Sequence, residues 1–148
     1  MNNFYKFSTF VLTILFCKLS HSTELYWVGS SGDFNDNTRW RIDSVNGPMS
    51  SQAPISTDNC YFMAYALNTG TPITVTFSSN ASCKSLYVDS LINASSIVTF
   101  ESASNVINFD IYGSFHLSQN SRFNFNGLLR FRSILNGNEY VKLNGNKL

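Results

Sequence analysis

The chain has 148 residues, of which 43% are hydrophobic and only 13% are charged, and its formal net charge is +1 at pH 7. This length fits one domain with a modest core. Because the few basic residues are balanced by acidic ones, the composition excludes a protein that binds nucleic acid through a strongly basic surface. Polarity comes mainly from Ser, Thr and Asn, which suit turns and solvated strand faces.

Residues 1–22 have the composition of an export signal. Lys6 supplies a positive charge, and residues 7–19 form an apolar stretch followed by small side chains. The stretch is too interrupted for a membrane-spanning helix, which needs about 20 apolar residues. We therefore expect a signal peptide over 1–22, a secreted protein with no membrane span in its mature part, and a single β-rich domain over 23–148.

After the leader, short segments alternate apolar and polar residues between clusters of Ser, Asn and Gly. The alternation is clear in segments 73–77, 86–88, 97–100 and 107–111, and a period of two is typical of β-strands. No segment of the mature part sustains a helical period. We expect the inward side chains to form one continuous core, made by Val75, Leu86, Val98, Phe109, Ile111, Phe115, Leu117, Phe125, Leu129 and Phe131.

The carboxyl half contains an internal similarity with a period of 14 residues. Aligning Gly113 with Gly127 also superimposes Phe109 on Phe123. Short strands that cannot bury themselves alone usually stack on one another. The pattern favours an all-β fold of the parallel β-solenoid (β-helix) type, with an antiparallel β-sandwich as the alternative.

The last residues predict an open end of this stack. Segment 140–148 has the composition of another strand and turn, and no polar capping segment follows it in the sequence given. We interpret the chain as an amino-terminal fragment of a longer solenoid. Its open edge should fray or pair with a neighbour.

Aromatic residues and glycines are concentrated directly after the leader. In one interpretation, Trp27, Phe34 and Trp40 pack together as an aromatic amino-terminal cap over the first unit of the stack. In the other, Tyr26, Trp27 or Trp40 presents a ring face to a sugar. These three residues are therefore the candidate ligand-binding residues, with surface glycans or other surface proteins as partners.

Two cysteines remain once the leader is removed, Cys60 and Cys83. An even number of cysteines in an exported protein predicts a disulfide between them. The alternative is a pair of buried free thiols, since sequence alone does not supply the geometry of the bond.

Acidic and amide side chains near the aromatic motif raise the question of a metal site. Asp33, Asn35, Asp36 and Asn37 offer oxygen ligands of the kind that calcium prefers. Their spacing lacks the order of a helix-loop-helix calcium loop. Side-chain capping of turns explains the same residues, and we predict no metal and no cofactor.

No catalytic motif stands out in the mature part. His116 lies between two apolar residues, so it points outward from a strand. Neither a Gly-x-Ser-x-Gly elbow nor a metal-binding pair of histidines is present. A glycoside hydrolase could use Asp89 with Glu101 or Asp110, but spacing cannot bring them together. We predict a protein that is not an enzyme.

The order of the motifs over 26–40, 53–62 and 81–86 resembles the amino-terminal module of large, repetitive cell-surface proteins of Bacteroidota. Those proteins are of the adhesin and gliding-associated type and are often exported by the type IX system. The resemblance implies a structural or adhesive module on the outer-membrane surface of a Gram-negative bacterium. The alternative is a carbohydrate-binding or carbohydrate-active solenoid domain. Phe34 stands where the family commonly has Trp, and Cys60 where it commonly has an aliphatic residue.

Overall fold

The computed structural model describes residues 22–67, 70–89, 97–133 and 139–145. The predicted signal peptide lies outside the described residues except for its last position. The described part is all-β, as the alternation predicts, and it contains no helix long and apolar enough to cross a membrane. Its strands are β1 (Glu24–Trp27), β2 (Gly32–Asp33), β3 (Trp40–Ile42), β4 (Asn59–Phe62), β5 (Ile73–Phe77), β6 (Ala81–Cys83), β7 (Ser85–Val88), β8 (Val98–Ser102), β9 (Asn108–Ile111), β10 (Phe115–His116), β11 (Ser121–Asn124), β12 (Leu128–Phe131) and β13 (Val141–Lys142). Two 3-10 turns complete the set, η1 (Asn37–Arg39) and η2 (Ala64–Ala66).

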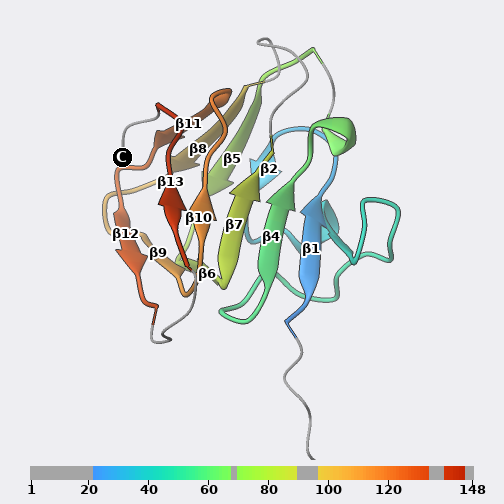
Figure 1. The fold of residues 1–148 in the computed structure, drawn as a ribbon, viewed down its shortest axis with the longest axis horizontal. Coiled ribbons are helices and arrows are strands. Elements are labelled where there is room, and N and C mark those ends of the chain that lie inside the picture. The colour runs from blue at the N-terminus through green and yellow to red at the C-terminus, as the bar shows by residue number, and fades with distance from the viewer. Residues whose placement is uncertain (1–21, 68–69, 90–96, 134–138, 146–148) are drawn as a thin grey trace, which may run out of the picture.

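The strands form three sheets that face one another across the core (Figure 1). The first sheet has the order β13-β10-β7-β4-β1-β3, the second β11-β8-β5-β2, and the third β12-β9-β6. All pairings between these strands are parallel except that of β1 with β3. The antiparallel pairing expected of a sandwich is therefore confined to one edge.

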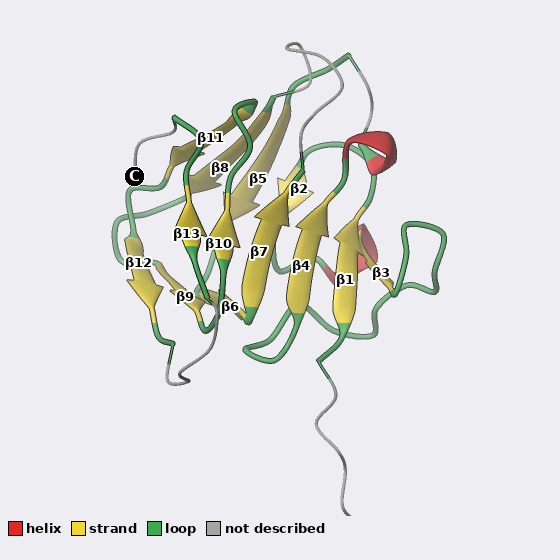
Figure 2. Cartoon of the chain, viewed as in Figure 1, coloured by secondary structure: helices red, strands yellow, loops and turns green. Residues whose placement is uncertain are grey.

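Successive strands visit the three sheets in turn. The chain passes through β4, β5 and β6, then β7, β8 and β9, then β10, β11 and β12, and β13 returns to the first sheet (Figure 2). Equivalent positions of the first sheet are Cys60, Leu86, Phe115 and Val141, separated by 26, 29 and 26 residues. The predicted period of 14 is therefore wrong, because it aligns strands of different sheets.

Alternation within each strand places apolar side chains in the core. In β5, for example, Ile73, Val75 and Phe77 are buried, whereas the two threonines between them are only partly covered. Of the predicted core, Val75, Leu86, Val98, Phe109, Ile111, Phe115 and Leu117 are almost completely buried. Phe125 and Leu129 are partly buried, and Phe131 is 44% exposed. Burial thus weakens toward β12, which pairs on one side only, with β9.

Aromatic rings dominate the interior. Phe34 stacks on Phe77 with ring centroids 4.7 Å apart, and Phe62 meets Phe100 edge to face at 5.1 Å. Offset stacked and edge-to-face arrangements are the favourable ones for aromatic pairs. Each of these rings also removes a large apolar area from water, worth about 1.5–3 kcal/mol per side chain. The core is therefore held together by contacts between successive sheets and not only along them.

Candidate functional site

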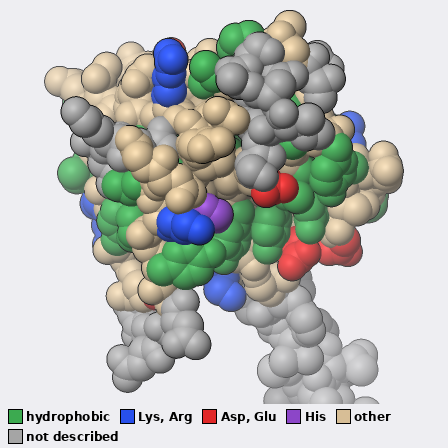
Figure 3. Space-filling model, turned by 45° about the horizontal axis from the view of Figure 1, so that its top comes forward, with side chains coloured by type: hydrophobic (Ala, Val, Ile, Leu, Met, Phe, Trp, Pro, Cys, Tyr) green, Lys and Arg blue, Asp and Glu red, His purple; other side chains and the backbone are tan. Residues whose placement is uncertain are grey.

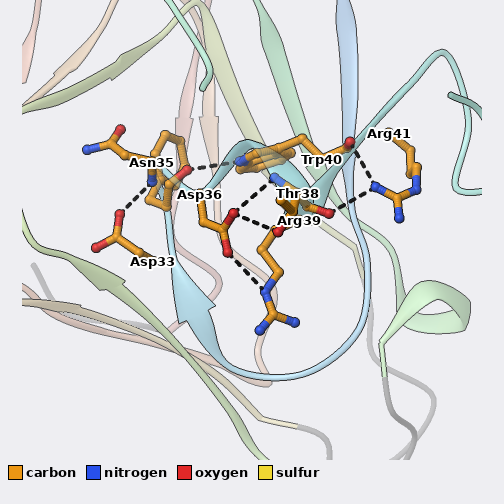
Figure 4. A network of polar contacts seen from close by, with 8 residues as sticks. Asp33, Asn35, Asp36, Thr38, Arg39, Trp40 and Arg41 are labelled. Carbon is orange, nitrogen blue, oxygen red and sulfur yellow. Dashed lines mark hydrogen bonds and ion pairs between the residues drawn. The ribbon is translucent and has the colours of Figure 1, made fainter. Parts of the chain in front are cut away.

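The aromatic motif over 26–40 folds into β1, β2, η1 and β3, and it buries its tryptophans. The exposed fractions of Trp27 and Trp40 are both 0%. Trp40 Nε1 donates a hydrogen bond of 2.9 Å to the main-chain oxygen of Phe34, which fixes the ring in the core (Figure 4). Neither tryptophan can present a face to a ligand, so of the three candidate ligand-binding residues only Tyr26 reaches the surface. Both tryptophans belong to the packed cap.

Within this motif, Gly29 has a positive φ of 88°, which other residues rarely adopt, and Arg39 approaches Gly32 closely. A Cβ atom on Gly32 would lie 2.8 Å from Nε of Arg39. The guanidinium group therefore lies over the glycine backbone, and it also reaches Asp36 at 3.6 Å. The glycines of the motif thus serve packing within the cap.

The acidic and amide side chains near the cap bond to the chain itself. Asp33 accepts hydrogen bonds from the main-chain N–H of Asn35 and of Ser78, at 2.7 and 3.0 Å. Asp36 caps η1 by accepting from Thr38 N at 3.0 Å and Thr38 Oγ1 at 2.6 Å (Figure 4). Hydrogen bonds to the charged form lower the pKa of Asp36. These are the capping roles that short Asx side chains play in turns. Within the described ranges, no group of three His, Cys, Asp or Glu side chains could hold a metal ion.

Tyr26 belongs to a row of three tyrosines on the outer face of the first sheet, here called the tyrosine row: Tyr26, Tyr61 and Tyr87. They occupy matching positions of β1, β4 and β7. Tyr26 and Tyr61 stack with ring centroids 4.9 Å apart and an interplanar angle of 16°, and Tyr61 and Tyr87 stack at 5.1 Å and 14°. All three rings are partly exposed. Hydrophobic side chains accordingly form a band across this face in Figure 3.

Burial raises the pKa of two phenols in the row, those of Tyr26 and Tyr61. Partial burial is the main cause that raises the pKa of Tyr61 to about 12, with Glu24 and the neighbouring tyrosines adding to it. The pKa of Tyr26 is also raised, by burial and by the hydrogen bond of 3.0 Å that its hydroxyl donates to Glu24. Tyr26 and Tyr61 therefore keep neutral hydroxyl groups at physiological pH.

Basic side chains continue the row beyond Tyr87. His116 pairs in register with Tyr87, and Lys142 pairs with His116. As predicted, His116 lies outside the core; burial and then the charge of Lys142 lower its pKa. Both residues line an open depression of about 580 Å³, together with Asp89, Gln119 and Asn144 among others. The tyrosine row thus ends beside a polar hollow.

Sequence reasoning did not find Tyr61 and Tyr87 as partners of Tyr26. A signal exists, because each tyrosine stands between two buried residues in its strand: Leu25 and Trp27, Cys60 and Phe62, Leu86 and Val88. Three such triplets predict three outward tyrosines. To predict that these tyrosines lie side by side, one must also know the register between strands that are 26 or more residues apart in the sequence.

Cys60 and Cys83 are both buried and both free, so the predicted disulfide is not formed. They come from β4 of the first sheet and β6 of the third, and their side chains meet in the core. Burial is the main cause that raises the pKa of Cys60, and a hydrogen bond with Cys83 adds to it. The apolar core therefore stabilises the protonated thiol, whereas a disulfide forms through the thiolate.

The carboxylates considered for glycoside hydrolysis are distributed over three sheets. Asp89 follows β7 of the first sheet, Glu101 lies on β8 of the second, and Asp110 lies on β9 of the third. Asp110 is moreover paired with arginine side chains. The structure does not assemble these residues into one site.

Comparisons with family models, with curated proteins and with solved structures give no match to this chain. The function must therefore be argued from the geometry of the tyrosine row and of the surfaces around it.

Proposed function

We propose that the chain is a non-catalytic structural and adhesive module of a cell-surface protein, built as a parallel β-solenoid, with the tyrosine row as its contact face. The observation that supports this proposal is the in-register stacking of Tyr26, Tyr61 and Tyr87 on the outside of a sheet whose inner face is filled by the core. The regular succession of strands through three sheets supports the solenoid, and the leader composition supports export.

Tyrosine is suited to adhesion because it offers a large amphipathic area with few rotatable bonds, and it is enriched at protein interfaces. The rings of the row are already held by their neighbours at centroid distances of 4.9 and 5.1 Å. Little side-chain entropy is then lost when a partner covers them. The tyrosine row therefore forms a preordered, partly apolar contact face.

The stacking also indicates the kind of partner. Both faces of the Tyr61 ring are occupied by Tyr26 and Tyr87, so a sugar ring cannot stack on it. The exposed edges and hydroxyls match a protein surface better than a sugar face. We therefore favour another surface protein as the partner of the row. The alternative function, carbohydrate binding, needs a surface with polar groups directed outward.

The test is an adhesion assay with beads that carry the purified chain, applied to glass coated with protein extracted from the bacterial cell surface. Tyr61→Ser removes the centre of the row, and we expect it to lower the number of attached beads severalfold. Val106→Ser is the control, because it also replaces an exposed apolar side chain but lies between β8 and β9, away from the first sheet, and it should leave adhesion unchanged. Thermal unfolding of each variant checks that the fold is retained. Equal adhesion by wild type and Tyr61→Ser, or an equal loss in both variants, would contradict the proposal.

A further inference from the structure

The third sheet, formed by β6, β9 and β12, carries a polar groove on the side facing away from the core. The groove has a volume of about 280 Å³ and is lined by Asn35, Asn80, Asn108, Asp110, Tyr112 and Arg130 among others. It shares no residue with the tyrosine row. Apart from Pro54 and Ala81, its lining consists of side chains that donate or accept hydrogen bonds.

Charge on this face is organised around Asp110. Its carboxylate accepts from Arg130 Nε at 2.5 Å and Nη2 at 2.8 Å, and Arg132 Nε lies 2.9 Å from the same group. Two guanidinium groups share one carboxylate, which leaves a surplus of one positive charge. The Asp110 side chain is 14% exposed, whereas those of Arg130 and Arg132 are 34% and 44% exposed.

The contacts with Asp110 do not use all of the N–H groups of Arg130 and Arg132. Asp110 is engaged by Nε and Nη2 of Arg130 and by Nε of Arg132. These contacts with the carboxylate do not use Nη1 of Arg130 or the terminal amino groups of Arg132. Guanidinium groups held in this way match the planar, bidentate geometry of a carboxylate.

The amide end of the groove is also fixed without any ligand. Asn80 Oδ1 accepts from Asn108 N at 2.8 Å and from Asn108 Nδ2 at 3.3 Å. Asn35 Nδ2 donates to the main-chain oxygen of Asn80 at 3.3 Å and to Ser79 Oγ at 2.9 Å. Side chains that are ordered beforehand bind at a smaller entropic cost.

We infer that this groove binds an acidic polysaccharide, with Arg130 of its lining on a sugar carboxylate, aided by Arg132 which lies beside the groove and shares Asp110 with Arg130, and with the asparagines and Tyr112 on the sugar ring and its hydroxyls. Two features select this ligand class. The surplus charge attracts an anion, and the amides serve hydroxyl groups. The low overall basic content of the protein also argues against nucleic acid.

The test is calorimetric titration of the full chain with a hexameric oligogalacturonate, and with its fully methyl-esterified form as the uncharged match. We expect binding of the acid form and little binding of the ester. Arg132→Gln should weaken binding about tenfold or more, because it removes a charged donor pair from the carboxylate. Arg132→Lys keeps the charge but not the bidentate geometry, so its affinity for oligogalacturonate should lie between those of the wild type and Arg132→Gln. Arg122→Gln on the outer face of β11 is the matched control and should change nothing.

The inference is overturned if the folded wild type does not bind the oligogalacturonate, if it binds the ester equally well, or if Arg122→Gln and Arg132→Gln lose the same affinity. Competition by single-stranded DNA at equal charge concentration would also overturn it, since that indicates general polyanion binding. Tyr61→Ser should keep its affinity for oligogalacturonate. Failure of the groove and failure of the adhesive row are therefore distinguishable.

Discussion

Trp27 and Trp40 lie directly opposite each other across the antiparallel pair of β1 and β3, and their rings meet edge to face with centroids 5.3 Å apart. Their indole N–H groups differ. Trp40 Nε1 donates to the oxygen of Phe34, whereas Trp27 Nε1 is buried without a hydrogen-bond partner among the described residues. An unpaired buried donor costs free energy of folding, so the two rings are not equivalent.

We expect Trp40→Phe to lower the free energy of unfolding more than Trp27→Phe does, by about 1–2 kcal/mol. Both changes remove a similar volume from the core, but Trp40→Phe also leaves the Phe34 oxygen without its donor, whereas Trp27→Phe removes a donor that has no acceptor. Urea denaturation of the two variants measures the difference. A larger loss in Trp27→Phe would contradict this expectation, because it would mean that Trp27 Nε1 donates a stabilising hydrogen bond.

Stability should fall at alkaline pH because of the tyrosine row. The pKa of Tyr61 is about 12 in the folded chain, above the ordinary tyrosine value of 10.0. The folded state therefore retains the phenol proton over a range in which the unfolded chain has already lost it. The contribution of this group is fully present below pH 10 and is lost as the pH rises toward about 12.

Tyr61→Phe should remove this part of the alkaline decline, and Tyr112→Phe on the third-sheet side is its control. Unfolding midpoints between pH 9 and 12 provide the measurement, with phenolate absorbance as an independent check. An unchanged pH profile in Tyr61→Phe would mean that other groups cause the decline.

Cys60 and Cys83 should react with a thiol reagent only when the chain unfolds. Both are buried, and burial raises the pKa of Cys60, so little thiolate is present in the folded state at pH 8. In a Cys17→Ser background we expect two thiols to be labelled in denaturant and almost none in native buffer. Labelling of a native thiol within minutes would contradict this, as would an intact mass two hydrogens lower than that of the reduced chain.

Amide hydrogens of β13 should exchange with solvent much faster than those of β7. β7 lies between β4 and β10 in the first sheet, whereas β13 pairs on one side only, and both its residues are exposed. Opening at such an edge breaks few buried contacts. Hydrogen-exchange mass spectrometry compares the two strands directly. Equal protection would show that β13 is covered, and the dependence of that protection on protein concentration would show whether a second copy covers it.

Much of the fold follows from local sequence, because alternation is a local property. The strand segments 73–77 and 107–111 were predicted from their period of two, and the structure has β5 and β9 there. Strand pairing is not local. Partners in the parallel sheets are more than 20 residues apart in most cases and are joined by turns of different length, so no fixed period marks them in the sequence.

The candidate site was only partly predictable for the same reason. The motif indicates Tyr26 as a candidate. Its contact surface, however, includes Tyr61 and Tyr87, which lie beside it only because of the register between β1, β4 and β7. Trp27 and Trp40 were assigned two roles, and only the core role agrees with their burial. Residue spacing in the sequence does not predict the pairing of Asp110 with Arg130 and Arg132, because Asp110 and Arg130 are 20 residues apart and meet only through the pairing of β9 with β12.

The antiparallel strand β3 has a consequence for how copies of the chain can associate. Apart from β3, each strand of the first sheet pairs parallel to its neighbours. A second molecule could continue this order only if its edge strand paired parallel to the edge strand that it meets. The first sheet offers such an edge at β13, but it presents β3 at its other end. A strand added beside β3 in the direction of β1 would pair with β3 antiparallel, so the parallel order of the sheet does not continue at that end.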